Sequence, residues 1–459
     1  MQPLERNRQK LHAAGAKVIL NKPKKGDTAV QTKETAREFL RRHDMLYEQQ
    51  SFEELTNAYI ADFRAGLRGE RSTLMMLPSF LPAVSSPCTG ESVLVLDAGG
   101  TNLRAGRIRF DNNGTPVVEA LQKRRMPGTD STVTADEMFR TIAATAFAVA
   151  GEAKYACIAF SFPCESLPGG DGRILSMGKE SRVIGAEGRL VCDGIETALR
   201  SLGAPAHRRW RLINDTVGSM LGGMASCDRS RYADFIGFIL GTGTNACCHV
   251  AASAVTKSPE TAAMGGETIV NLESGGFGGA LRGTADVAVD AASEQPGDHP
   301  AEKMISGAYY RRVLHQTLLL AEKEGLLSGE SGKAIAGLTI TSAMVDAFCL
   351  SPEGGNAIAD ALATPADRAF AAEINDLLLE RAARIGAACL CAILHERALP
   401  EGNRTGICAD GTMLRLNPVL RPRMEAYIAE YTAQHRLGGA EFLFAGDATL
   451  LGCAWAALA

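Results

Sequence analysis

Two stretches of the chain share one order of apolar and polar positions. Residues 93–110, VLVLDAGGTNLRAGRIRF, run from an apolar segment through paired glycines into an alternating segment. Residues 235–250, FIGFILGTGTNACCHV, repeat this order, and Gly100-Thr101-Asn102 recurs as Gly243-Thr244-Asn245. Each stretch predicts a buried strand, a glycine turn and a second strand, which together make a β-hairpin. The repeat predicts a duplicated domain with a nucleotide between its halves.

The first glycine turn has a chemistry of its own. Gly99 and Gly100 permit positive φ and let backbone N–H groups approach an anion closely. Asp97 stands where the strand gives way to the turn. A carboxylate cannot hold a phosphate, but it can orient the water shell of Mg²⁺. One such turn is also typical of a tight hairpin with a solvated Asp, and the second copy is what favours phosphate binding.

Helices and strands alternate along the rest of the chain. Capping boxes at Ser51–Glu54 and Thr134–Glu137 predict helices that end near Gly69 and Gly151. A buried strand follows the second helix and brings Ser161 to a strand end, where α/β proteins collect ligand groups. Further elements are expected as a helix over 193–202, a strand over 211–213, a helix over 302–324, one or two helices over 365–399 and a last helix over 446–458. This order indicates an α/β chain in two similar halves.

Two acidic residues at predicted helix starts leave their roles open. Asp215 follows a short strand and begins a helix, so its side chain is either an N-cap or a functional carboxylate. Glu302 opens the predicted helix over 302–324, where an acid suits the helix dipole without any further role. Glu273 precedes a glycine-rich loop that can fold closely around a ligand.

Composition bounds the possible functions. A chain of 459 residues with 46% hydrophobic residues has material for two domain cores. A net charge of −4 argues against a nucleic-acid surface, and no apolar run approaches the roughly 20 residues of a membrane span. Residues 1–35 are basic and predict a flexible tail, and without a secretory h-region the expected location is the cytoplasm. The 12 cysteines form no CxxC pair, so we expect buried thiols rather than disulfides or zinc ligands.

Seven motifs stand in the order in which the hexokinases carry them, so the chain resembles that family over roughly residues 45–459. The motifs are Met76-Leu77-Pro78-Ser79-Phe80, residues 96–104, Phe160-Ser161-Phe162-Pro163-Cys164, Asn214-Asp215-Thr216-Val217-Gly218, residues 240–246, Glu302-Lys303-Met304-Ile305-Ser306-Gly307 and Asp410-Gly411-Thr412. The resemblance implies an α/β, duplicated ribonuclease-H-like (actin-like ATPase) fold with two domains around a cleft. It assigns 79–213 with 447–459 to a small domain, and 36–78 with 214–446 to a large one.

The resemblance also implies an activity, the ATP-dependent phosphorylation of a hexose, with glucose the first candidate, at its 6-hydroxyl. Asp215 matches the catalytic base, and Lys179 is the second catalytic candidate. A hexose is a ring of hydroxyl groups, which amides and carboxylates pair well. The residues that match sugar contacts are Ser161, Lys179, Asn214, Asp215, Asn245, Glu273 and Glu302.

ATP and Mg²⁺ are the cofactors that the resemblance implies. Asp97 and Asp215 would steer Mg²⁺ through water, while Lys179 and Arg104 would neutralise charge on the transferring group. The residues that match nucleotide contacts are Asp97, Gly99, Gly100, Thr101, Asn102, Arg104, Gly241, Thr242, Gly243, Thr244, Gly411, Thr412 and Gly446.

Three departures from the family pattern bear on specificity. Gly178 stands where the family has Thr, Ser274 where it has Trp, and residues 446–452 match its adenosine loop only in outline. These departures leave two alternatives, a kinase for a different monosaccharide and a catalytically weak sugar-binding regulator. The presence of Asp97, Asp215 and both glycine turns favours an active kinase.

Overall fold

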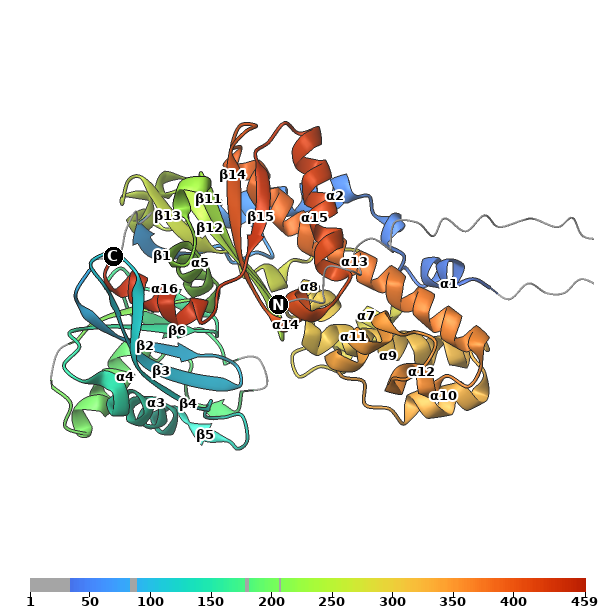
Figure 1. Ribbon diagram of the computed structural model, residues 1–459, viewed down its shortest axis with the longest axis horizontal. Coiled ribbons are helices and arrows are strands. Elements are labelled where there is room, and N and C mark those ends of the chain that lie inside the picture. The colour runs from blue at the N-terminus through green and yellow to red at the C-terminus, as the bar shows by residue number, and fades with distance from the viewer. Residues whose placement is uncertain (1–33, 83–88, 178–180, 206–207) are drawn as a thin grey trace, which may run out of the picture. The chain divides into compact units, whose positions relative to one another are not determined.

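The computed structural model describes residues 34–82, 89–177, 181–205 and 208–459 (Figure 1). The expected tail of residues 1–35 lies outside the described residues except for its last two positions, and Gly178 and Lys179 also lie outside them. Whether the tail is flexible therefore stays a prediction.

Both predicted hairpins are present. Strands β2 (Ser92–Ala98) and β3 (Asn102–Phe110) pair antiparallel across the first glycine turn, and β11 (Asp234–Leu240) pairs in the same way with β12 (Thr244–Ala251). Side chains of β2 alternate between two cores, as the period of a strand requires. Leu94 and Leu96 enter one core and Val93 and Val95 another, and all four are fully buried.

Each hairpin is the centre of a sheet, and the two sheets have the same strand order. The five-stranded sheet runs β10-β6-β2-β3-β4, with β6 and β10 parallel to β2. The six-stranded sheet runs β15-β14-β11-β12-β13-β1, with β14 and β15 parallel to β11. The remaining strands of these sheets are β1 (Leu77–Pro82), β4 (Pro116–Arg125), β6 (Tyr155–Phe160), β10 (Arg209–Ile213), β13 (Glu267–Asn271), β14 (Arg404–Asp410) and β15 (Gly439–Leu443). The duplication predicted from the glycine turns is thereby confirmed at the level of topology.

Helices follow corresponding strands in the two halves. In the first half α3 (Ala135–Ala150), α4 (Val191–Ser201) and α5 (Asp215–Ala225) follow β4, β6 and β10. In the second half a long helical insertion precedes β14, α15 (Leu420–Gln434) precedes β15, and α16 (Ala448–Ala457) follows it. The insertion contains α7 (Thr284–Ala291), α8 (Pro300–Ile305), α9 (Gly307–Lys323), α10 (Gly329–Ala336), α11 (Ser342–Leu350), α12 (Ala357–Ala361) and α13 (Pro365–Arg397). Short elements are α1 (Ala36–Arg42), α6 (Pro259–Ala262), α14 (Thr412–Leu416) and the pairs β5 (Val133–Thr134) with β9 (Val183–Ile184) and β7 (Cys164–Ser166) with β8 (Gly172–Ile174).

The predicted capping boxes are confirmed. Ser51 caps α2 (Phe52–Arg68) by accepting a hydrogen bond from the backbone N–H of Glu54, and Gly69 closes that helix in the left-handed conformation. Thr134 caps α3 in the same way. These local signals fix helix ends because they satisfy N–H groups that have no partner inside the helix.

Helices α5 and α16 lie against one another between the two sheets (Figure 1). Glycines make this close approach possible. A Cβ atom at Gly222 would lie 1.8 Å from the carbonyl oxygen of Ala448, and one at Gly452 would lie 1.9 Å from that of Gly218. Chain segments from the two halves therefore meet at a crossing that admits no larger residue at these positions.

Two expectations need correction. The helix expected over 302–324 is two helices, because Ser306 is extended and separates α8 from α9. The second concerns the start of the small domain, because β1 (Leu77–Pro82) pairs with β13. Residues 79–82, which the resemblance assigns to the small domain, therefore lie at the edge of the six-stranded sheet.

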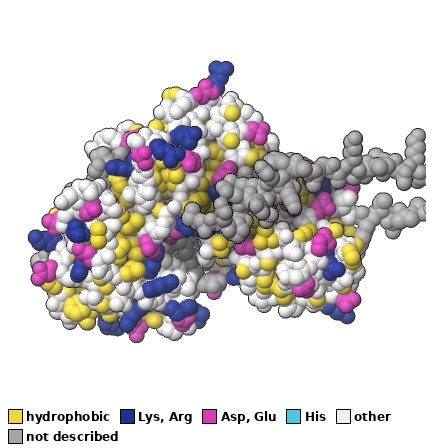
Figure 2. Space-filling view, in the orientation of Figure 1, with side chains coloured by type: hydrophobic (Ala, Val, Ile, Leu, Met, Phe, Trp, Pro, Cys, Tyr) yellow, Lys and Arg dark blue, Asp and Glu magenta, His cyan; other side chains and the backbone are white. Residues whose placement is uncertain are grey.

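Most described thiols lie in the core and charged side chains lie on the surface, as in an ordinary globular protein. Of the described cysteines all are free and all but Cys227 and Cys349 are buried, as expected. Figure 2 shows acidic and basic side chains interspersed over the face in view. Among the described residues, every helix is too short or too polar to cross a bilayer.

Candidate active site

The carboxyl ends of three parallel strands bring the first site residues together. Asp97 lies at the end of β2, Ser161 directly follows β6, and Asp215 begins the helix after β10. The Ser161 Oγ donates a hydrogen bond to Asp215 Oδ2, and the Ser161 N–H donates to the Ala98 carbonyl at 3.1 Å. Ligand groups of α/β sheets gather at such strand ends, and these three do so here.

Asp215 is not the N-cap of α5. The cap is Asn214, whose Oδ1 accepts a hydrogen bond from the Thr216 N–H at 2.9 Å. Asp215 accepts from Ser161 and, at 3.3 Å, from the Thr216 hydroxyl. A carboxylate has about four lone-pair sites, so further acceptor capacity remains, and the N-terminal end of α5 favours its negative charge. The alternative of a purely capping Asp215 is wrong.

A chain of amides continues from Asn214 to Glu273. Asn245 Nδ2 donates to Asn271 Oδ1 at 2.7 Å and to Asn214 Oδ1 at 3.3 Å. Asn271 Nδ2 in turn donates to Glu273 Oε1 at 2.8 Å. Asn245 Oδ1 accepts from the backbone of Ala246 and, at 3.1 Å, from that of Ser274. These bonds fix the orientation of the side chains that match sugar contacts.

Asn271 was missed by the sequence reasoning. It is the last residue of β13, 5% exposed, and it links Asn245 to Glu273. The signal in the sequence is an amide two residues before Glu273. Its partner on β12 could be found only from the strand register, which places Asn271 opposite Cys247.

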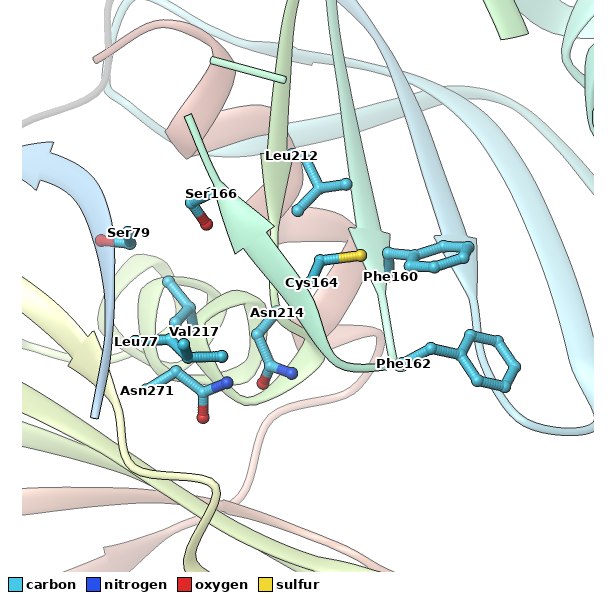
Figure 3. Close-up of a pocket in the computed structure, with 10 residues that line it drawn as sticks. All are labelled: Leu77, Ser79, Phe160, Phe162, Cys164, Ser166, Leu212, Asn214, Val217 and Asn271. Carbon is cyan, nitrogen blue, oxygen red and sulfur yellow. The ribbon is translucent and has the colours of Figure 1, made fainter. Parts of the chain in front are cut away.

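Asn214 and Asn271 also line a pocket (Figure 3). The pocket lies where β1, β6, β7, β10 and α5 meet, and most of its wall is apolar. Its other lining residues are Leu77, Ser79, Phe160, Phe162, Cys164, Ser166, Leu212 and Val217. Burial raises the pKa of the Cys164 thiol well above its usual value, which keeps that thiol protonated and unreactive.

Glu302 is joined to the second glycine turn. Its Oε2 accepts a hydrogen bond from the Thr244 N–H at 3.0 Å. Gly243 makes this contact possible, since a Cβ there would lie 2.4 Å from Glu302 Oε2. Helix α8 carries Glu302, and a buried ion pair holds that helix, with Lys303 Nζ 2.5 Å from Asp290 Oδ1. Glu302 therefore does more than complement the dipole of its helix, since its carboxylate also holds the second glycine turn.

The second glycine turn is held by its neighbours. The Gly307 N–H at the start of α9 donates to the Gly241 carbonyl at 2.7 Å, and the Ala308 N–H donates to Thr242 at 3.3 Å. Gly411 lies against the same turn, and a Cβ atom there would lie 2.2 Å from the Leu240 carbonyl oxygen. Its φ of +113° also favours glycine at this position. The turn and the Gly411 segment thus form one surface.

Arg415 joins the Gly411 segment to the loop that contains Gly446. Its Nε lies 3.2 Å from Asp410 Oδ1, and its Nη2 donates to the Ala445 carbonyl at 3.1 Å. Gly411, Thr412 and Gly446, which match contacts to adenosine, are thereby brought to one region.

Asp97 and Arg104 form an ion pair beside the first turn. Arg104 Nε and Nη2 donate to Asp97 Oδ2 at 2.8 and 2.6 Å. Burial raises the pKa of Asp97, and Arg104 offsets only part of that effect. Burial lowers the pKa of Arg104, but Asp97, with Asp447 and Asp410, outweighs it and raises the pKa overall. Asp215 and Asp410 add negative potential at Asp97, so the site is rich in carboxylates.

Among the described residues, no three His, Cys, Asp or Glu side chains are grouped so that they could hold a bare metal ion. The hard oxygen atoms of Asp97 and Asp215 are of the donor type that hydrated Mg²⁺ accepts through its water shell. The described residues that match sugar contacts are therefore linked or adjacent, while Lys179 lies outside the described residues.

The paired sheets and glycine turns define a class, the duplicated ribonuclease-H-like fold of the actin-like ATPases. The hexokinase of Schistosoma mansoni, solved in complex with glucose, superposes with a TM-score of 0.73 at 23% identity, over 91% of this chain and 98% of that one. A second hexokinase crystal structure gives a TM-score of 0.66 at 21% identity, over 92% of this chain and 95% of that one. The expected fold class is confirmed.

Family models carry the assignment further. Two models, both described as hexokinase, match residues 36–225 and residues 235–459. Hexokinase-3 of Homo sapiens is 29% identical over 390 residues, 80% of this chain and 41% of that protein. Hexokinase-like 1 protein of Arabidopsis thaliana is 29% identical over 415 residues, 82% of this chain and 81% of that protein. The chain belongs to the hexokinase family, and it spans about two fifths of the mammalian relatives that it matches.

Proposed function

We propose that this protein transfers the γ-phosphoryl group of ATP to the 6-hydroxyl of a hexose, with glucose as the first candidate. The observation that carries the proposal is the linked set of polar side chains. It runs from Ser161 and Asp215 through Asn214, Asn245 and Asn271 to Glu273, and Glu302 joins it at Thr244. The set lies beside both glycine turns.

The chemistry of this set suits a sugar. Each hexose hydroxyl donates one hydrogen bond and accepts others, and amides with carboxylates offer both functions in fixed positions. A site built in this way rejects a compound that lacks a hydroxyl, because the buried partner would be left unsatisfied. Asn245 and Asn271 are 8% and 5% exposed and are held by hydrogen bonds within the set, so the positions of its polar groups are fixed.

Asp215 is the proposed general base. It would take the proton from the 6-hydroxyl as that oxygen attacks the γ-phosphorus and the bond from that phosphorus to the leaving ADP oxygen breaks. The Ser161 hydroxyl bonded to Oδ2 orients the carboxylate, which lies at the N-terminal end of α5. Mg²⁺, when it is bound with ATP, would supply neutralisation of phosphate charge, and Arg104 is a described cation beside the first turn.

The test is a coupled assay of hexoses with ATP and Mg²⁺, run on the wild-type protein and on Asp215→Asn. We expect at least one hexose to be phosphorylated, and kcat to fall about 10²- to 10⁴-fold in the variant, because the amide cannot accept the proton. Binding of the hexose, measured by calorimetry, should change little. Asp44→Asn is the matched control, since Asp44 lies in a surface turn at the end of α1. Normal kcat in Asp215→Asn would contradict the assignment of the base.

One observation supports a second candidate, a sugar-binding regulator with weak catalysis. Arg104 is already paired with Asp97 and Asp447 and is less available to a phosphate. Under this alternative the protein would bind a hexose in calorimetry but give no turnover with any hexose and nucleotide. Turnover by the wild-type protein that is lost in Asp215→Asn excludes it.

A further inference from the structure

Asp447 adopts an unusual backbone conformation at the start of α16. Its φ and ψ are +49° and +29°, the left-handed region, which costs a residue other than glycine roughly 1 kcal/mol or more. An aspartate commonly caps a helix from an extended backbone, but in the left-handed conformation the Asp447 side chain makes no capping hydrogen bond. Strain combined with an unused cap indicates that the side chain has a different task.

That task is an ion pair with Arg104. Arg104 Nη1 donates to Asp447 Oδ1 at 2.8 Å, while Nε and Nη2 hold Asp97. The guanidinium group is therefore engaged by two carboxylates, and Asp410 adds negative potential to the same region. A triphosphate that entered beside the first glycine turn would meet a cation whose charge is already balanced.

The two partners of Arg104 differ in how easily they are displaced. The Asp97 side chain is 12% exposed, whereas that of Asp447 is 56% exposed. Asp447 can swing into water at little cost, while Asp97 would lose its partner inside the protein. Asp447 is thus the carboxylate that an incoming phosphate replaces.

We propose that Asp447 is a positioning residue that occupies Arg104 in the nucleotide-free protein and competes with the phosphates of the nucleotide. This inference rests on the proposed function, because it assumes that a nucleotide binds beside the first glycine turn. Its consequence is that the protein binds nucleotide more weakly than its other residues allow. A concentration of nucleotide that saturates a variant without this carboxylate would leave the wild-type protein only partly filled.

Two substitutions remove the carboxylate without forcing the backbone. Asn tolerates the left-handed region and Gly prefers it, so Asp447→Asn and Asp447→Gly keep the turn. An exposed ion pair changes an equilibrium constant about two- to fivefold, and removal of a charge that repels the phosphates adds to this. We therefore expect the Kd for MgADP to fall about three- to tenfold in both variants.

The measurement is calorimetric titration of MgADP, and of a non-hydrolysable MgATP analogue, into the protein saturated with its best hexose. Asp44→Asn is the matched control, because Asp44 also has positive φ, at +56°, and lies far along the chain from the site. In steady-state assays the nucleotide KM should fall in the Asp447 variants while the hexose KM is unchanged. A general structural defect would instead weaken the binding of both nucleotide and hexose.

The outcomes separate this inference from the proposed function. Nucleotide affinity that is unchanged or weaker in both Asp447 variants, while the wild-type protein binds and turns over ATP, overturns the inference and leaves the kinase activity standing. Tighter nucleotide binding in Asp447→Asn and Asp447→Gly but not in Asp44→Asn supports it. Absence of nucleotide binding in the wild-type protein and in both variants overturns the inference together with the proposed function.

Discussion

Replacement of Gly243 by Ala tests whether Glu302 has to reach the second glycine turn. A Cβ at Gly243 would lie 2.4 Å from Glu302 Oε2 and 3.2 Å from its Cδ, so the carboxylate has to move. The backbone at Gly243 is not left-handed, and Ala meets no strain of its own there. The substitution therefore acts through the displacement of Glu302.

The size of the effect follows from the bond that is lost. Glu302 Oε2 accepts from the Thr244 N–H at 3.0 Å, and Thr244 is 7% exposed, so the N–H is left without that partner. A hydrogen bond to a charged group is worth about 1.5–3 kcal/mol, and about 1.4 kcal/mol corresponds to tenfold. Glu302 is also a proposed sugar contact, so its displacement should remove a charge-assisted hydrogen bond of the same size to the hexose, and the hexose KM should rise roughly 10- to 150-fold.

The assay compares hexose KM, nucleotide KM and thermal stability in Gly243→Ala and in two companions. Gly329→Ala is the control, since a Cβ there meets nothing within 4 Å and the residue begins α10, outside the proposed site, so both KM values should stay near wild type. Adding Glu302→Asp to Gly243→Ala shortens the acid by one methylene, relieves the contact and should recover part of the hexose affinity. A hexose KM within about twofold of wild type in Gly243→Ala would refute the role given to Glu302.

Two further predictions concern stability. Gly222→Ala should lower the free energy of unfolding in urea by about 1–3 kcal/mol, because its Cβ would lie 1.8 Å from the Ala448 carbonyl oxygen. Gly169→Ala is the control and should be neutral, since a Cβ there would meet no atom within 4 Å. Burial lowers the pKa of Lys257 from 10.5 to about 8, so between these values the unfolded chain binds more protons there and stability rises with pH. The free energy of unfolding in urea of the wild-type protein should therefore rise relative to that of Lys257→Met between pH 7 and pH 10. A difference that stays constant with pH would contradict the lowered pKa.

Elements whose causes are local can be predicted from the amino-acid pattern. A glycine turn after an apolar run has few alternatives to a hairpin, and a capping box satisfies N–H groups within one helical turn. Both hairpins and the helices after Ser51 and Thr134 therefore lie where the pattern predicts them. The repeated turn also indicated the duplication, because two similar halves require two similar local signals.

The way in which these elements meet depends on long-range packing. The break at Ser306 follows from the glycine turn, whose Gly241 carbonyl accepts the Gly307 N–H at 2.7 Å, a contact between residues far apart in sequence. The link from Asn245 through Asn271 depends on the register of β12 against β13, and the pair of Arg104 with Asp447 depends on the return of α16 to the first sheet. Local patterns carry no information on such pairings, because they arise only when sheets and helices pack.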